Sequence, residues 1–268
     1  MTGWGQDGPL AQAAGHDINY ISLSGALHSI GRRGERPVPP LNLVGDYGGG
    51  GMFLAFGVVC ALLDAQKSGK GQVIDVSMVE GSAALMGMFE TFQGAGTFTD
   101  QRGTHRLSSG AHYYDVYETR DGKYISIGSI EPQFYALLLE KIGLDPDKYS
   151  PQQEDSKWPG WGKELIKIFK TKTRDEWCRI MEGTDVCFAP VLSLKEAPEH
   201  PHNRARKTFL DIDGLIQHAP APRFSRTKCE NPKPGRKAGQ DTDLVLSEAG
   251  YNQDEINRLK TKGAVSVA

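Results

Sequence analysis

Four consecutive glycines, residues 48–51, stand immediately before the most apolar stretch of the chain. That stretch, Met52–Leu63, is twelve residues long, which is short of the roughly 18 residues that a membrane-spanning helix needs. We therefore predict no membrane span but a buried helix of a globular protein, extending to Gln66. Because glycine has no side chain, the run before the helix also allows a backbone or a substrate to approach closely.

The composition is that of an ordinary globular protein. Of the 268 residues, 31 are Lys or Arg and 33 are Asp or Glu, so the net charge is −2. This balance lacks the excess positive charge of a nucleic-acid-binding protein. The four cysteines form no C-x-x-C pair, so we expect no zinc or thioredoxin-type site. With no signal peptide visible, we expect a reducing, intracellular location.

The pattern of apolar residues and turn signals predicts an α/β protein. Helices are predicted over residues 11–30 (interrupted by glycine), 52–66, 78–92, 131–142, 161–170, 175–181 and 242–259, and strands over 72–77, 113–118, 124–128 and 187–192. Asp121-Gly122 predicts a hairpin between the second and third strands. We divide the chain into part of a large domain (1–92), a linker (93–110), a small α+β domain (111–205), and a linker with a C-terminal return to the large domain (206–268).

Three residues are candidates for acid/base chemistry. His16 lies in the polar cluster Gly15–Tyr20 and is the residue type most suited to proton transfer near neutral pH, although Asp17 or Asn19 there could simply cap a turn. Asp46 precedes the glycine run; it is either a helix N-cap or an acid/base group beside backbone N–H groups that could hold an enolate oxygen. Glu131 stands before Pro132, which is also ordinary chemistry for a helix start.

Other signals are weaker. The glycine run lacks the G-x-x-x-x-G-K-[ST] pattern, which excludes a P-loop ATPase. His200 and His202 could form a metal pair, but no third ligand stands at a suitable spacing. Arg32, Arg33 and Arg36 form a basic loop that either faces solvent or meets phosphates. From these residues alone, the chain is an intracellular α/β protein with acid/base chemistry as one function among several open ones.

The combination of motifs is more specific. Five ordered blocks resemble the α-methylacyl-CoA racemase family, within the class III CoA-transferase superfamily. They are Gly15–Tyr20, Leu41–Asp46, Gly69–Asp75 with Met78–Gly81, Ile130–Tyr135, and Gly183–Asp185 with Pro190–Leu192.

The resemblance implies a class III CoA-transferase fold, with an incomplete Rossmann-like large domain and a smaller α+β domain. It also implies an interlocked homodimer in which each active site combines residues of both subunits. In the family a nucleotide-binding segment precedes the block that corresponds to residues 2–6. We therefore expect this chain to be N-terminally truncated relative to the family.

The resemblance further implies inversion of the α-carbon of 2-methylacyl-CoA thioesters, such as branched fatty acyl-CoAs and bile-acid intermediates. The reaction is a proton transfer through an enolate and uses neither a metal nor a redox cofactor. His16 and Asp46 are implied as the two acid/base groups, and Glu131 as the partner of the histidine. The residues implied to lie along the pantetheine of the CoA thioester are Gly15, His16, Asp17, Ile18, Asn19 and Tyr20.

Two alternatives stay open at this point. In class III CoA-transferases the aspartate that matches Asp46 is a nucleophile, but those enzymes lack the histidine of the Gly15–Tyr20 block and the Glu-Pro-Gln block, which are both present here. The second alternative is an inactive, truncated fragment that only dimerises. The expected compartment is the peroxisome or mitochondrion in a eukaryote and the cytoplasm in a bacterium.

Overall fold

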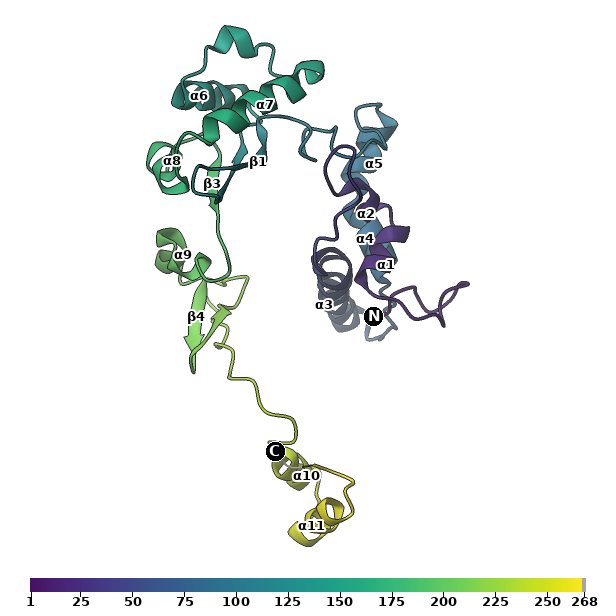
Figure 1. Cartoon of the computed structure of the whole chain (residues 1–268). Helices are drawn as coiled ribbons and strands as arrows, with labels where there is room; N and C mark the ends of the chain where they lie inside the picture. The colour runs from purple at the N-terminus through teal and green to yellow at the C-terminus, as the bar shows by residue number, and fades with distance from the viewer. Residues whose placement is uncertain (267–268) are drawn as a thin grey trace. The chain divides into compact units, whose positions relative to one another are not determined.

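The computed structural model describes residues 1–266, which form two compact units joined between Val191 and Leu192. Figure 1 shows the whole chain coloured from the N-terminus to the C-terminus.

The first third of the chain is helical. Its elements are α1 (Asp17–Leu23), α2 (Ala26–Ser29), the π-helix η1 (Leu43–Met52), α3 (Phe53–Ser68), α4 (Met78–Leu85) and α5 (Gly87–Gly94). The predicted interruption at a glycine is confirmed at Gly25, whose φ of 82° is left-handed. Such a φ is accessible to glycine at little cost, and it separates α1 from α2.

Two sequence-based expectations for this region are wrong. Residues 72–77 form no strand, and their only ladder contact is an isolated parallel bridge between Thr2 and Ser77. The alternation of apolar residues there reflects an extended segment that lacks a neighbouring strand within residues 1–266. The predicted helix over 78–92 is two helices, because the chain leaves α4 at Met86 before α5 begins.

Helix α3 forms where the apolar run predicts it, but the expectation that it is buried is wrong. None of its residues is buried, and Phe56 and Val59 are 70% and 64% exposed. Together with η1 it makes a continuous helix, Leu43–Ser68, of 26 residues that is long and apolar enough to cross a membrane. Core helices of soluble proteins can have the same length and composition, so this helix does not by itself indicate a membrane protein.

The glycine run has a packing role. Helix α4 packs against η1 at Gly81, where an added Cβ would overlap the carbonyl oxygen of Gly49. The two backbones meet directly because neither residue has a side chain. This contact fixes the position of η1, which carries Asp46.

Residues 111–191 form the second half of the first unit. Strands β1 (Tyr114–Glu118), β2 (Tyr124–Gly128) and β3 (Phe188–Val191) make an antiparallel sheet in the order β1-β2-β3. The helical elements are α6 (Pro132–Ile142), α7 (Trp158–Phe169), α8 (Arg174–Met181) and the 3-10 turns η2 (Pro146–Tyr149) and η3 (Asp155–Lys157). The predicted hairpin at Asp121-Gly122 is confirmed. The hydrophobic core of residues 111–191 includes Tyr117, Ile125, Leu138, Leu165, Phe169 and Trp177.

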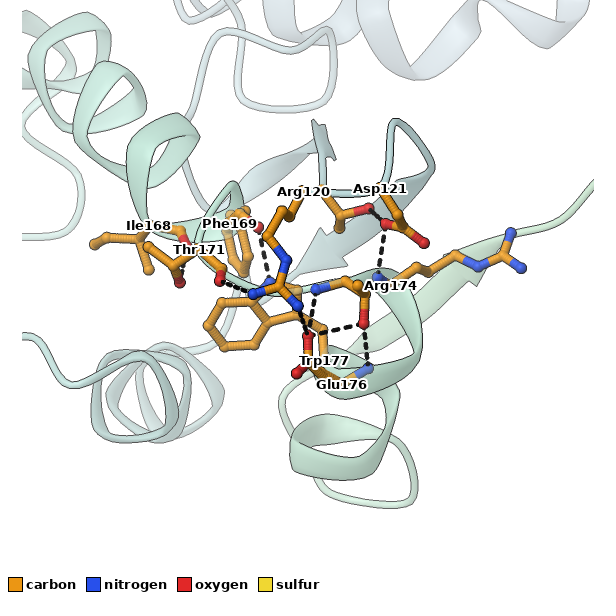
Figure 2. Close-up of polar contacts among 10 residues, drawn as sticks. Arg120, Asp121, Ile168, Phe169, Thr171, Arg174, Glu176 and Trp177 are labelled. Atoms are coloured by element: carbon orange, nitrogen blue, oxygen red, sulfur yellow. Dashed lines mark hydrogen bonds and ion pairs between the residues drawn. The ribbon is translucent and has the colours of Figure 1, made fainter.

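Polar contacts hold the hairpin turn against the start of α8, as Figure 2 shows. Arg120 donates to Glu176 at 2.9 Å and to the carbonyl of Thr171 at 3.2 Å. Asp121 accepts from the N–H of Arg174 at 3.1 Å. Thr173 and Glu176 form the capping box of α8, the helix that the sequence predicts over residues 175–181.

The second unit begins at Leu192 and has little buried surface. It contains η4 (Ala197–Glu199), α9 (Pro201–Arg206), the hairpin β4 (Phe209–Ile212) and β5 (Leu215–His218), α10 (Thr242–Glu248) and α11 (Gln253–Thr261). The sequence analysis did not predict the β4–β5 hairpin, although Asp213-Gly214 is the same turn signal as Asp121-Gly122. The single helix predicted over 242–259 is wrong, because the chain turns at Gly250 between α10 and α11.

A buried histidine makes the stability of this fold depend on pH. The His112 ring contacts Tyr113, Tyr135 and Trp161, and only its Nε2 is hydrogen-bonded, at 2.7 Å to the Tyr135 hydroxyl. Burial lowers the pKa of His112 to about 3. The unfolded chain, with a histidine pKa of about 6.5, therefore binds the extra proton, and stability falls as the pH drops from about 6.5 towards 3.

We expect the free energy of unfolding to decrease by up to about 1.4 kcal/mol per pH unit in that window through this residue. His112→Phe should reduce this slope, as measured by urea unfolding at a series of pH values. An unchanged slope would assign the acid sensitivity to other groups.

Candidate active site

One buried carboxylate joins the two segments that carry His16 and Asp46. The Asp17 side chain is 6% exposed, and its Oδ2 accepts hydrogen bonds from the N–H groups of Gly45 (2.8 Å) and Asp46 (2.7 Å). A side chain on Gly45 would displace this carboxylate, because its Cβ would lie 2.6 Å from Asp17 Oδ2. The start of α1 is thus fixed against the first turn of η1.

His16 is the residue immediately before α1, and its side chain is exposed. Its N–H donates to Asn19 Oδ1 at 3.1 Å, which holds the entry to the helix. The sequence alternative of a capping turn is therefore confirmed for Asn19, whereas the Asp17 carboxylate accepts from the distant N–H groups of Gly45 and Asp46. The Asn19 amide bonds the backbone N–H of His16 and not its imidazole, so this contact is compatible with an acid/base role of the ring.

Asp46 lies inside the first turn of η1 and is half-buried. The alternative that it is an N-cap is wrong, because Asn42 occupies that position. Asn42 instead donates from Nδ2 to Asp46 Oδ2 at 3.1 Å, which orients the carboxylate. Asn42 was not predicted as a site residue; its spacing of four residues from Asp46 on a helical segment was the available signal.

The Gly15–Tyr20 block has an inner and an outer face. Asp17 and Tyr20 are buried, and the Tyr20 hydroxyl donates to the carbonyl of Gly15. Trp4 packs edge-on against Tyr20 with 4.8 Å between ring centroids. Burial, together with the charge of Asp46, raises the pKa of Tyr20. The exposed residues of the block are His16, Ile18 and Asn19.

Glu131 is found where the sequence predicts it, at the start of α6, with Pro132 as the first helical residue. Its side chain is exposed and makes no capping hydrogen bond. Within residues 1–266 it forms no hydrogen bond or ion pair with His16 or Asp46. Burial raises the pKa of Cys187, and the charge of Glu131 adds to this shift. The structure therefore brings His16 and Asp46 together but not Glu131.

Residues that could hold a metal ion do not gather in the described part of the chain. Among residues 1–266, no three His, Cys, Asp or Glu side chains form a group that could bind one. The arrangement at Asp17 instead offers two acid/base side chains on adjacent backbone segments, which is suited to proton transfer.

The joining role of Asp17 gives a testable expectation. In Asp17→Ala, two backbone N–H groups lose a charged acceptor, so we expect a loss of about 2–4 kcal/mol in the free energy of unfolding. Asp17→Asn keeps an acceptor oxygen and should lose clearly less. Urea unfolding followed by circular dichroism measures both variants, and equal losses would contradict the role of the acceptor.

The comparison with known families settles which fold this is. A sequence model of CoA-transferase family III matches residues 1–242. The chain belongs to this family. The predicted class III CoA-transferase fold is therefore confirmed. A solved CaiB/BaiF family protein from Brucella suis superposes with a TM-score of 0.75 at 19% identity, covering 92% of this chain and 66% of that one.

Two curated relatives of high identity are racemases. The chain is 46% identical over 261 residues to α-methylacyl-CoA racemase of Mus musculus and 41% identical over 263 residues to that of Homo sapiens. Each alignment covers 97% of this chain and 68% or 69% of the relative. The chain thus spans about two thirds of the length of these relatives, and the resemblance to the racemase family is confirmed.

Proposed function

We propose that this chain carries the two-base proton-transfer site of an α-methylacyl-CoA racemase. The observation that carries the proposal is the Asp17 carboxylate, which fixes the segments of His16 and Asp46 to each other through two short hydrogen bonds. The identity to mouse and human racemases over 97% of the chain supports the same reaction.

The reaction needs two groups on opposite faces of the α-carbon. One group removes the α-proton, the electron pair passes into the thioester carbonyl as an enolate, and the other group returns a proton to the opposite face. We assign these roles to His16 and Asp46, since both are acid/base side chains and neither is engaged in an ion pair within residues 1–266. Asn42, which donates to Asp46, is a positioning residue.

One detail of the sequence-based mechanism changes. Backbone N–H groups beside Asp46 were expected to hold the enolate oxygen, but those of Gly45 and Asp46 donate to Asp17. They are therefore not available to the substrate. The CoA-transferase alternative, with Asp46 as nucleophile, is not favoured, because the mouse and human relatives at 46% and 41% identity are racemases.

The finer points of the function are also proposals. The substrate is a 2-methylacyl-CoA thioester that passes along the exposed residues of the Gly15–Tyr20 block, and no metal or redox cofactor takes part. The chain works as a homodimer, in which Glu131 of one subunit meets His16 of the other; the exposed apolar surface of α3 supports burial against another polypeptide. The compartment is intracellular. Light scattering of the purified chain tests the dimer.

Exchange of the α-proton tests the function directly. One enantiomer of a 2-methylacyl-CoA is incubated with the chain in D₂O, and the α-proton signal is followed by NMR together with optical purity. We expect the α-proton signal and the optical purity both to decrease with time. A folded sample that exchanges no proton would overturn the proposal for this chain.

Glu131→Gln separates a positioning role from a folding role. Because the side chain is exposed and makes no capping bond, we expect unchanged thermal stability. Loss of its charge beside His16 should slow exchange by about 10-fold, less than loss of either base. The melting temperature and the exchange rate are measured on the same sample. A destabilised variant would instead assign Glu131 to the start of α6.

A further inference from the structure

A cavity in the first unit shares no lining residue with the Asp17 site. It has a volume of about 780 Å³, which is the size of a small-molecule site. The wall comes from the basic loop, from the segment after α5 and from the region of η3. The basic loop is the one that the sequence left open as either facing solvent or meeting phosphates, and the proposed reaction does not use the cavity.

Two guanidinium groups without a counter-ion line this cavity. Arg33 and Arg106 both contribute to the wall, and within residues 1–266 their side chains make no hydrogen bond or ion pair. Two neighbouring arginines, Arg32 and Arg102, do have hydrogen-bond partners. Arg32 makes a two-pronged ion pair with Asp115 at 2.8 and 2.9 Å, and Arg102 donates to the backbone carbonyls of His28 and Glu35.

The paired arginines fix the loop that presents Arg33. The Arg102 bonds span 67 to 74 residues of sequence and join the loop to the segment that carries Arg106. Gly103 is buried against the Arg33 backbone, where a Cβ would overlap the Arg33 nitrogen. A site whose backbone is already fixed loses less conformational entropy when a ligand binds.

Neutral donors complete the polar wall. Gln153 accepts from the Tyr113 hydroxyl through Oε1 at 3.0 Å, which leaves its amide N–H groups for a ligand. His105 accepts from the Leu107 N–H through Nδ1 at 3.2 Å, so its proton lies on Nε2. Burial and the charge of Arg106 lower the pKa of His105, which keeps the ring neutral. One carboxylate, that of Asp155, also lines the cavity, and Phe92 and Trp158 supply apolar surface.

We propose that this cavity binds the phosphate group of a small organic phosphate, with Arg33 and Arg106 as its charged ligands. Guanidinium groups match the geometry of phosphate oxygens and bind them through charge-assisted hydrogen bonds. The Gln153 amide and the His105 Nε2–H add neutral donors, and the organic part of the ligand lies against Phe92 and Trp158. Asp155 opposes the ligand's charge.

Calorimetric titration of the full chain with phenyl phosphate tests the site without depending on racemase activity. We expect Arg33→Gln/Arg106→Gln to weaken binding at least ~10-fold, since two charge-assisted contacts are lost. Asp155→Asn should tighten binding several-fold, a change that misfolding would not produce. Arg36→Gln, in the same loop but outside the cavity wall, is the matched control and should bind as the unmodified chain does.

A second experiment identifies the molecule that carries the phosphate. This experiment rests on the proposed function. If the phosphate belongs to the CoA substrate, the double variant raises the KM for a 2-methylacyl-CoA but not for the corresponding acyl-pantetheine. If it belongs to a separate ligand, both KM values stay unchanged while phenyl phosphate binding is still lost. No binding of phenyl phosphate to the unmodified chain, or an equal loss in Arg36→Gln, would overturn the proposal.

Discussion

Replacing His16 with alanine is expected to lower the rate of racemisation by about 10²–10⁴-fold, the usual effect of losing one positioned acid/base group. Asp46→Asn should cause a loss of similar size. The fold should survive both changes, because His16 is exposed and Asp46 is held through its backbone N–H. A two-base site makes a further demand. Each variant should retain exchange of the α-proton in one enantiomer only, the one whose proton the remaining base removes.

The stereochemical readout makes this prediction specific. Each enantiomer is incubated separately in D₂O with each variant, and the four exchange rates are compared. His202→Ala, at an exposed histidine of α9, serves as the control and should leave all rates unchanged. Equal residual exchange of both enantiomers in either variant would show that a single group serves both faces of the substrate.

Gly81→Ala is expected to cost about 3 kcal/mol or more in the free energy of unfolding, the upper end for an overpacked site. The added methyl group would overlap the Gly49 carbonyl, and this neighbour is backbone that cannot rotate away. Helix α4 would have to move away from η1. Since η1 carries Asp46, we also expect the exchange rate to fall in the fraction that stays folded.

A second glycine in the same region provides the control for this change. Gly87 lies in α5, and an added Cβ there would meet nothing within 4 Å. Gly87→Ala should therefore raise stability by about 0.5–1 kcal/mol through the higher helix propensity of alanine. Urea unfolding midpoints of the two variants should move in opposite directions. A Gly81→Ala midpoint equal to that of the unmodified chain would contradict the described packing of α4.

Features with a local cause could be predicted from the sequence. The hairpin at Asp121-Gly122, the start of α6 at Glu131-Pro132 and the start of α8 at Thr173 each depend on residues within a few positions of one another. Turn and capping preferences act at that range. The family resemblance added the fold and the pairing of His16 with Asp46 as the two bases, which these local signals do not contain.

Features that depend on distant partners could not be predicted in this way. Asp17 meets the N–H groups of Gly45 and Asp46 across 28 and 29 residues, and the aspartate itself looks like any capping residue. The segment 72–77 alternates as a strand does, yet a strand also needs a neighbour, which periodicity does not reveal. The glycine run was expected to allow close approach of a backbone or a substrate, but the run itself does not reveal that the backbone of Gly81 packs there against Gly49.

The bare surface of α3 has a consequence for how this protein is made. Several exposed apolar side chains of this helix emerge from the ribosome close together, and nothing in residues 1–266 covers them. They are Phe56, Val59, Leu62 and Leu63. Until another polypeptide covers these side chains, they can associate non-specifically with any chain that has exposed apolar groups. Synthesis of this chain alone should therefore depend on chaperones, and overproduction without them should direct much of it into inclusion bodies.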